Sequence, residues 1–181
     1  MGIKFIDKNR KNEICGDEII ARCSCGCGLL SVKAFKALSG VDGKRQKILS
    51  IEHFGNSVLD TKKAIASSLY YTEEAIGIIM NLISGKVNDG NGVIEDLDGS
   101  MLMIEHDTDK DYGESIVIAG FYDERSFRKY MKNPEKGTKY LAWNIHLEEK
   151  EYKKFAEAIE NLFVKEFDYE VLEKDDRRSD D

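Results

Sequence analysis

The chain has 181 residues, of which 41% are hydrophobic and 34% are charged, and its formal net charge is −7. This composition excludes a disordered chain, and the length predicts one globular domain. The longest apolar stretch, residues 75–83, is too short to span a bilayer, and residues 1–12 lack the apolar core of a secretory signal. We therefore expect a cytoplasmic protein that contacts no membrane and keeps its four cysteines reduced.

Charge is unevenly distributed along the chain. Residues 1–50 carry ten basic and five acidic side chains, whereas residues 51–100 carry three and eight. A basic front followed by an acidic remainder is compatible with a protein or nucleoprotein partner. The basic residues are mostly lysine, isoleucine is plentiful, and there is one proline. This usage suggests an AT-rich bacterial or mobile-element genome.

The first third of the chain predicts an antiparallel meander. A short strand is expected at residues 3–6. The alternating segment that follows contains Gly16-Asp17, and glycine at the first position of a two-residue turn favours a type II′ hairpin there. Two further strands are expected at 29–38 and 47–54. A basic turn at 39–46 joins them.

Two helices are predicted next. The first runs from residue 60 to 71, with Ile65 and Leu69 one turn apart. The second begins at Thr72, because a hydroxyl followed by two glutamates satisfies the free N–H groups of a first turn, and it ends at Gly85. Its apolar face carries Ile76, Ile79, Met80 and Ile83.

The second half of the chain predicts strands and a long final helix. Asp98-Gly99 suits a type I′ turn, so residues 93–106 are expected to form a hairpin. Strands are predicted at 115–122 and 140–147, joined by a basic connection. The final helix, about 148–167, has an apolar stripe at helical spacing, which predicts core packing or, in part, a homodimer face. The stripe consists of Tyr152, Phe155, Ala156, Ile159, Leu162, Phe163 and Phe167.

These elements predict an α+β fold. We expect a single domain over residues 1–168, with a mostly antiparallel sheet of about six or seven strands and two or three packed helices. Residues 169–181, which are rich in acidic side chains, are expected to form a flexible tail.

The cysteines are the first candidate site. Cys15, Cys23, Cys25 and Cys27 together could hold zinc, because thiolates are preferred zinc ligands and the glycines between them would let a loop fold around an ion. The spacing is not the paired C-x2-C of zinc ribbons, and on a strand the thiols would line up instead of converging. We therefore predict that the four cysteines are small core residues and that the chain binds no cofactor. A zinc site is the alternative.

A reactive thiol is the remaining interpretation of the cysteines. A nucleophilic cysteine needs a base, and the three histidines, His53, His106 and His146, are scattered through the sequence. A small enzyme would have to assemble its site from distant residues such as Cys25, His53, His106 and Asp107. We therefore predict no catalytic residues.

The basic connection is the second candidate site. In residues 124–140 basic side chains alternate with aromatic ones, so cations could contact phosphates while aromatic rings stack on bases. The alternative is a solvated loop whose aromatic rings anchor it to the core. The residues are Arg125, Phe127, Arg128, Lys129, Tyr130, Lys132, Lys136 and Lys139, with Lys44 and Arg45 as an extension.

Three classes of function follow. The absence of an assembled catalytic motif and the split charge favour a non-enzymatic binding protein that occupies a protein or nucleoprotein surface. An inhibitor of a host defence or nuclease complex is one concrete version. The alternative is a nucleic-acid-binding module that uses residues 124–140, with a structural cysteine-bound zinc. The small enzyme described above is the third class.

Overall fold

The computed structural model describes residues 13–38, 45–56, 64–85, 90–110 and 113–167. Within them the fold is α+β, as predicted. The prediction of one sheet with six or seven strands is wrong, because eight strands form two four-stranded antiparallel sheets. The strand predicted at 3–6 and the tail at 169–181 lie outside the described residues.

The first sheet is an antiparallel meander in the order β1-β2-β3-β4. A helix, α1, follows it directly. Their bounds are Glu13–Arg22 for β1, Gly28–Leu38 for β2, Arg45–Asn56 for β3, Ala64–Thr72 for β4 and Glu73–Ile83 for α1.

The second sheet repeats this plan in the order β5-β6-β7-β8, and the long helix α4 follows it. Three short helices are inserted between β7 and β8. The bounds are Gly92–Glu95 for β5, Met101–Asp109 for β6, Gly113–Phe121 for β7, Glu124–Lys132 for α2, Pro134–Gly137 for α3, Thr138–Tyr140 for the 3-10 helix η2, Trp143–Leu147 for β8 and Glu149–Phe167 for α4.

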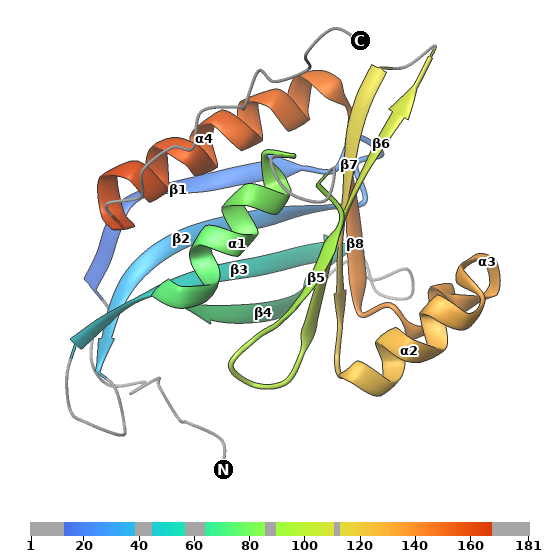
Figure 1. Cartoon of the computed structure of the whole chain (residues 1–181), viewed down its shortest axis with the longest axis horizontal. Helices are drawn as coiled ribbons and strands as arrows, with labels where there is room; N and C mark the ends of the chain where they lie inside the picture. Colours follow the sequence, from blue (N-terminus) through green and yellow to red (C-terminus); the bar gives the residue numbers. More distant parts are fainter. Residues whose placement is uncertain (1–12, 39–44, 57–63, 86–89, 111–112, 168–181) are drawn as a thin grey trace, which may run out of the picture.

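The two sheets stand at a steep angle to each other (Figure 1). Helices α1 and α4 lie in front of the first sheet, with α4 running along β1, whereas α2 and α3 lie beside the second sheet (Figure 1). Each half is thus four antiparallel strands followed by a helix. The sequence showed no repeat at this period, so the likeness between the halves is one of topology.

The helix predicted from residue 60 to 71 is wrong, because this segment contains β4. Leu69 and Tyr71 are both buried in the main core, whereas Tyr70 between them packs with Phe35 on the opposite face. That alternation has the period of a strand. β4 pairs along its length with β3, with Leu49 opposite Tyr71, and this pairing outweighs the helical spacing of two apolar residues.

The hairpin turn predicted at Gly16-Asp17 is also wrong. β1 continues through these residues, and its register against β2 shifts between Cys15 and Ile19. Gly16 has φ +72°, the left-handed conformation that glycine supplies at β-bulges. The chain reverses at Cys23–Cys27 instead, which brings the cysteine-rich segment into a turn.

The hairpin predicted around Asp98-Gly99 is present, but its loop is longer than a two-residue turn. The Asp96 carboxylate accepts hydrogen bonds from the backbone N–H of Asp98 at 2.9 Å and of Ser100 at 2.8 Å. Gly99 has φ +85°. Burial of the Asp96 carboxyl raises its pKa, and these backbone donors oppose the shift.

The basic connection is helical. The Asp123 side chain accepts from the N–H of Ser126 at 2.6 Å and so caps α2, and Pro134 stands in the first turn of α3. These are standard helix-start signals.

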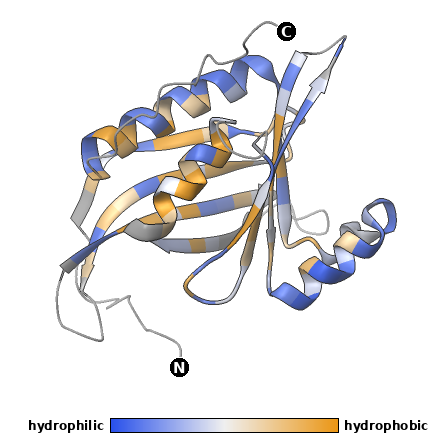
Figure 2. Ribbon diagram, in the orientation of Figure 1, coloured by the Kyte–Doolittle hydropathy of each residue, from blue (hydrophilic) through white to orange (hydrophobic). Residues whose placement is uncertain are grey.

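One hydrophobic core joins both sheets with α1 and α4. Hydrophobic residues lie on α1 and on the side of α4 that faces the first sheet (Figure 2). The predicted apolar stripe of α4 is buried there, apart from the half-buried Ala156. No helix in the described part of the chain is long and apolar enough to cross a membrane.

The sheets meet at β8. The Trp143 indole stacks on the His53 imidazole of β3, with ring centroids 5.0 Å apart and planes 3° apart. Three glycines make room for this pair. A Cβ on Gly28 or Gly55 would lie 2.8 Å from the His53 ring, and one on Gly120 would overlap Cε2 and Nε1 of Trp143.

We therefore expect Gly120→Ala to destabilise the protein by about 1–3 kcal/mol, the usual cost of overpacking a core. Trp143→Leu removes the atoms that the new Cβ would overlap, because a leucine side chain ends at its Cδ atoms, so Gly120→Ala should cost less in that background. Urea unfolding of the four proteins of this double-mutant cycle measures the coupling. Equal costs in the two backgrounds would show that Trp143 does not set the need for glycine.

Candidate metal centre

The three cysteines of the β1–β2 turn converge. The Cys23 N–H donates to Gly28 O at 2.9 Å and the Gly26 N–H donates to Cys23 O at 2.8 Å, with Gly26 at φ +75°. The expectation that these thiols line up on a strand is therefore wrong, because the segment folds back on itself.

The sulfur atoms lie close enough to share one ion. Cys23 Sγ lies 3.0 Å from Cys25 Sγ and 3.2 Å from Cys27 Sγ, and all three lie within 4.8 Å of one another. Cys23 is buried, whereas Cys25 and Cys27 are exposed. Cys15, the fourth predicted ligand, is buried in β1 and does not belong to this group. We call Cys23, Cys25 and Cys27 the thiol cluster.

Strand β8 holds the turn in place. The Ser24 N–H donates to His146 O at 2.8 Å, and the His146 N–H lies 3.3 Å from Cys23 Sγ. The Glu148 N–H donates to Ser24 Oγ at 3.0 Å. The turn is thus bonded to the last residues before α4, on the edge of β8 that does not pair with β7. Sequence reasoning missed these contacts, since they join residues more than 120 positions apart.

The thiols influence one another's protonation. Hydrogen bonds from Cys27 and then from Cys23 hold the pKa of Cys25 below its usual value. The same interaction with Cys25, together with partial burial, raises the pKa of Cys27 to about 12. As pH rises, Cys25 therefore loses its proton before Cys27 does.

This donor set suits a soft metal ion. Thiolates are the preferred protein ligands of Zn²⁺ and Cu⁺. The three cysteines could bind a metal, and two of them face solvent. In a tetrahedral site three protein ligands leave one position for water or an outside donor.

No histidine forms a hydrogen bond with Cys25 in the described part of the chain. His53 is buried against Trp143, and its burial lowers its pKa. The His106 ring lies 2.8 Å from Leu82 O and edge-on to the ring of Tyr152. The hydrogen bonds among the described residues do not join Cys25, His53, His106 and Asp107 into one site.

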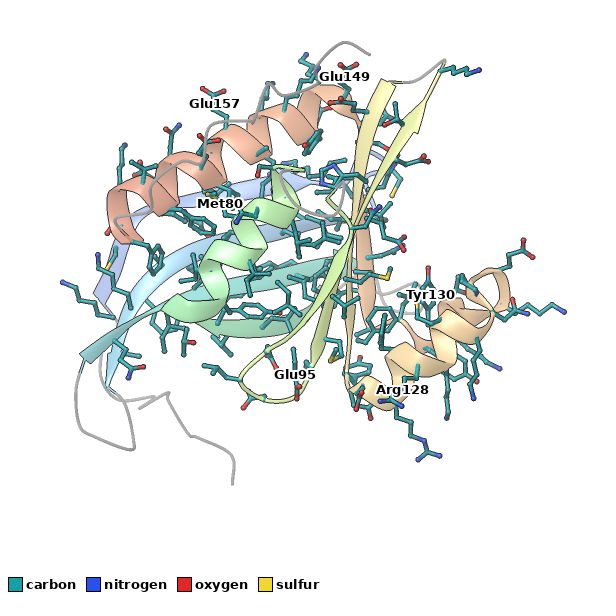
Figure 3. The ribbon with its side chains drawn as sticks, in the orientation of Figure 1. Met80, Glu95, Arg128, Tyr130, Glu149 and Glu157 are labelled. Carbon is teal, nitrogen blue, oxygen red and sulfur yellow. The ribbon has the colours of Figure 1, made fainter. Side chains whose placement is uncertain are left out.

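The predicted basic segment lies at the other end of β8. Phe127 and Tyr130 pack on Phe121, with ring centroids 5.4 and 5.3 Å away, so these aromatic rings anchor α2 to the second sheet. Tyr130 points toward the sheet and Arg128 away from it (Figure 3). This placement matches the alternative in which the aromatic residues are anchors.

The basic side chains gather on the exposed side of α2. A shallow depression of about 500 Å³ is lined by Glu124 and four cations. We call Arg125, Arg128, Lys129 and Lys132 the α2 cationic surface. Arg128 forms an ion pair with Glu124 at 2.6 Å, so its charge is partly neutralised.

Tyr140 is the aromatic residue of this segment that lies among cations. The ammonium groups of Lys129 and Lys139 lie 5.3 and 5.2 Å from its ring centroid. Lys136 is exposed at the end of α3. Lys44 lies outside the described residues, and Arg45 is described only as the first backbone position of β3.

Searches of protein-family models, curated proteins and solved structures find no match to this chain. The candidate function therefore rests on the geometry of its own residues.

Cys25 should be the first of the clustered thiols to react with iodoacetamide as pH rises, because its lowered pKa makes it a thiolate at lower pH. Cys27→Ala removes its main hydrogen-bond donor, so the pH profile of Cys25 alkylation should move to higher pH. Mass spectrometry of peptides from the metal-free, reduced protein measures the rate at each site. Identical profiles for Cys25 and Cys27 would contradict the geometry of the cluster.

Proposed function

We propose that this chain is a non-enzymatic binding protein that occupies the surface of a protein or nucleoprotein partner. The α2 cationic surface is the observation that carries the proposal. It stands out on a chain whose net charge is −7, and α2 itself has no buried residue. A cluster of cations on an exposed helix attracts acidic surfaces and speeds their encounter.

An inhibitor of a nuclease or host defence complex is a concrete version of this function. A nucleoprotein presents phosphate groups that a cationic helix can contact. Steric occupation of a surface needs no reactive group.

We also propose that the thiol cluster holds Zn²⁺ in a structural role. Three soft donors meet on a turn that is bonded to β8, so an ion there would stabilise the junction of the two sheets. Zinc bound to thiolates displaces their protons, which the lowered pKa of Cys25 favours and the raised pKa of Cys27 opposes.

Direct nucleic-acid binding is the second candidate, favoured by the two lysines over the ring of Tyr140. A half-buried aromatic ring such as that of Tyr140, flanked by cations, can stack on a base with its open part while the cations contact phosphates. Binding of this kind weakens steeply with salt, and each lost phosphate contact lowers the slope by about 0.7 for single strands.

The charge-reversed variant Lys129→Glu/Lys132→Glu should lose retention on heparin, an acidic polymer that serves as the probe. Lys150→Glu/Lys153→Glu is the matched control, since it reverses two exposed lysines with the same spacing on α4. The measurement is the salt concentration at which each protein elutes from heparin. If wild type is not retained, or if both variants elute together, the α2 cationic surface is not a binding site.

A fluorescent single-stranded oligonucleotide separates the two candidates. The binding protein should retain heparin affinity without a saturable oligonucleotide complex. A complex whose salt slope falls when Lys129 and Lys132 are replaced would favour the nucleic-acid module instead.

Native mass spectrometry of the reduced protein should show one zinc ion that a chelator removes. Cys25→Ser/Cys27→Ser should lose the ion, and Cys15→Ala, which leaves the cluster intact, should keep it. Zinc at about 1,000 times its Kd should raise the free energy of unfolding by about 4 kcal/mol. A zinc stoichiometry unchanged by the double substitution would place the metal elsewhere.

A further inference from the structure

A groove of about 890 Å³ runs between β1 and α4. Its first wall is Gly16–Arg22, seven consecutive residues of a strand. Because alternate side chains of a strand point to opposite faces, a groove lined by consecutive residues follows the backbone edge. Its second wall is one stripe of α4, with Lys154, Phe155, Ala158, Leu162 and Lys165 among its residues. We call this the β1–α4 groove.

The hydrogen-bond phase of β1 shows which backbone groups face the groove. The Cys23 N–H donates to Gly28 O, so Cys23 and Gly28 form a hydrogen-bonded pair of the antiparallel ladder. Such pairs recur at every second residue. Ile19 and Ala21 therefore bond to β2, opposite Val32 and Leu30, and the N–H and C=O groups of Ile20 and Arg22 point the other way.

The same edge of the β1 segment already pairs with a strand just beyond Arg22. Ser24 has the orientation of Ile20 and Arg22, and its N–H donates to His146 O of β8. After β8 the chain turns away from the edge of β1 and begins α4 at Glu149. Among the described residues no strand pairs with the remaining edge of β1. Unpaired edge groups of this kind are a template for an incoming strand.

We propose that the β1–α4 groove binds an extended segment of a protein partner, which adds a fifth strand to β1. This inference rests on the proposed binding function and identifies a second contact through which a partner is held. The added strand bonds to Ile20 and Arg22 and continues the line on which β8 meets Ser24. Addition of a peptide strand to a sheet edge is a common mode of recognition, in which backbone bonds give affinity and alternate side chains give specificity.

The lining of the groove favours a partner segment in which apolar side chains recur at alternate positions. Side chains on one face of the added strand meet Phe155, Ala158 and Leu162 of α4, and those on the other face meet Ile20, which is 53% exposed. The charges at the two ends have both signs, with Arg22 and Glu151 at one end and Lys165 and Glu166 at the other.

The part of the groove that a strand can pair with is four residues long, because the register of β1 shifts between Cys15 and Ile19. A Cβ on Gly16 would lie 2.9 Å from the Glu166 carboxylate and 3.1 Å from Leu162 Cδ1, so α4 closes on β1 there. The regular edge spans about 10 Å from the Cα of Ile19 to the Cα of Arg22 at the usual rise of a strand.

A second copy of the chain fits less well than a single strand. Pairing of two β1 edges would place each α4 beside the shared junction, on the same side of the joined sheets. Each groove is already walled by its own α4, so the helix of the second copy would need the same space.

Amide hydrogen exchange of the full chain is the first test. In the free protein the amides of Ile20 and Arg22 should exchange faster than those of Ile19 and Ala21, which bond to β2. Protection of Ile20 and Arg22 at all concentrations would mean that another part of this chain covers the edge. Protection that grows with protein concentration would mean a second copy. Either result would overturn the proposal.

Selection of random 12-residue displayed peptides on the full chain is the second test. Recovered peptides, made synthetically, should protect the Ile20 and Arg22 amides, and Ile20→Asp should weaken their binding at least tenfold. Ile20→Pro, which removes a donor from the free edge, should abolish it. Ile78→Asp on α1 is the matched control, because Ile78 is 54% exposed and lies outside the groove.

Recovery of no peptide, or equal weakening by Ile20→Asp and Ile78→Asp, would overturn the proposal. Heparin retention and zinc stoichiometry report on the proposed function separately, because neither uses Ile20. Circular dichroism checks that each variant remains folded.

Discussion

The rest of the structure depends on the two edges of strand β8. One edge pairs with β7 and completes the second sheet, and the other receives the β1–β2 turn through Ser24 and Cys23. The stack of Trp143 on His53 adds an aromatic contact between the sheets. A five-residue strand therefore contacts both four-stranded units. With the units joined, one core includes both sheets and both long helices.

This junction is tightly packed and partly polar. His53 Nδ1 and Trp143 Nε1 are buried without a hydrogen-bond partner, and such groups carry a desolvation cost. The cost is lower for a neutral imidazole, and burial lowers the pKa of His53 accordingly. Glycines at positions 28, 55 and 120 let the backbone come close to the two rings. Close packing at the junction thus offsets its unpaired nitrogens.

The candidate sites are arranged around the same strand. The thiol cluster lies at the carboxyl end of β8, where the turn is bonded to His146 and Glu148. The α2 cationic surface lies beyond its amino end, on helices inserted between β7 and β8. The β1–α4 groove begins where the chain leaves β8 for α4. A metal ion on the thiols would hold the turn at the head of this groove, so the proposed metal site and the proposed partner site are neighbours.

The sequence by itself determined the elements whose signals are local. Apolar spacing and the residues at their ends identify α1 and α4, and alternation identifies β2, β3, β7 and the hairpin of β5 and β6. The basic character of residues 124–140 was also evident, as was the clustering of cysteines. Tertiary structure decided the state of residues 64–72, because pairing with β3 buries Leu69 and Tyr71 on one face. It also decided that there are two sheets, that Gly16 forms a bulge, and that three thiols converge while Cys15 stays apart. These outcomes depend on contacts such as that between Cys23 and His146, which are 123 positions apart, and local periodicity carries no information about pairing over that distance.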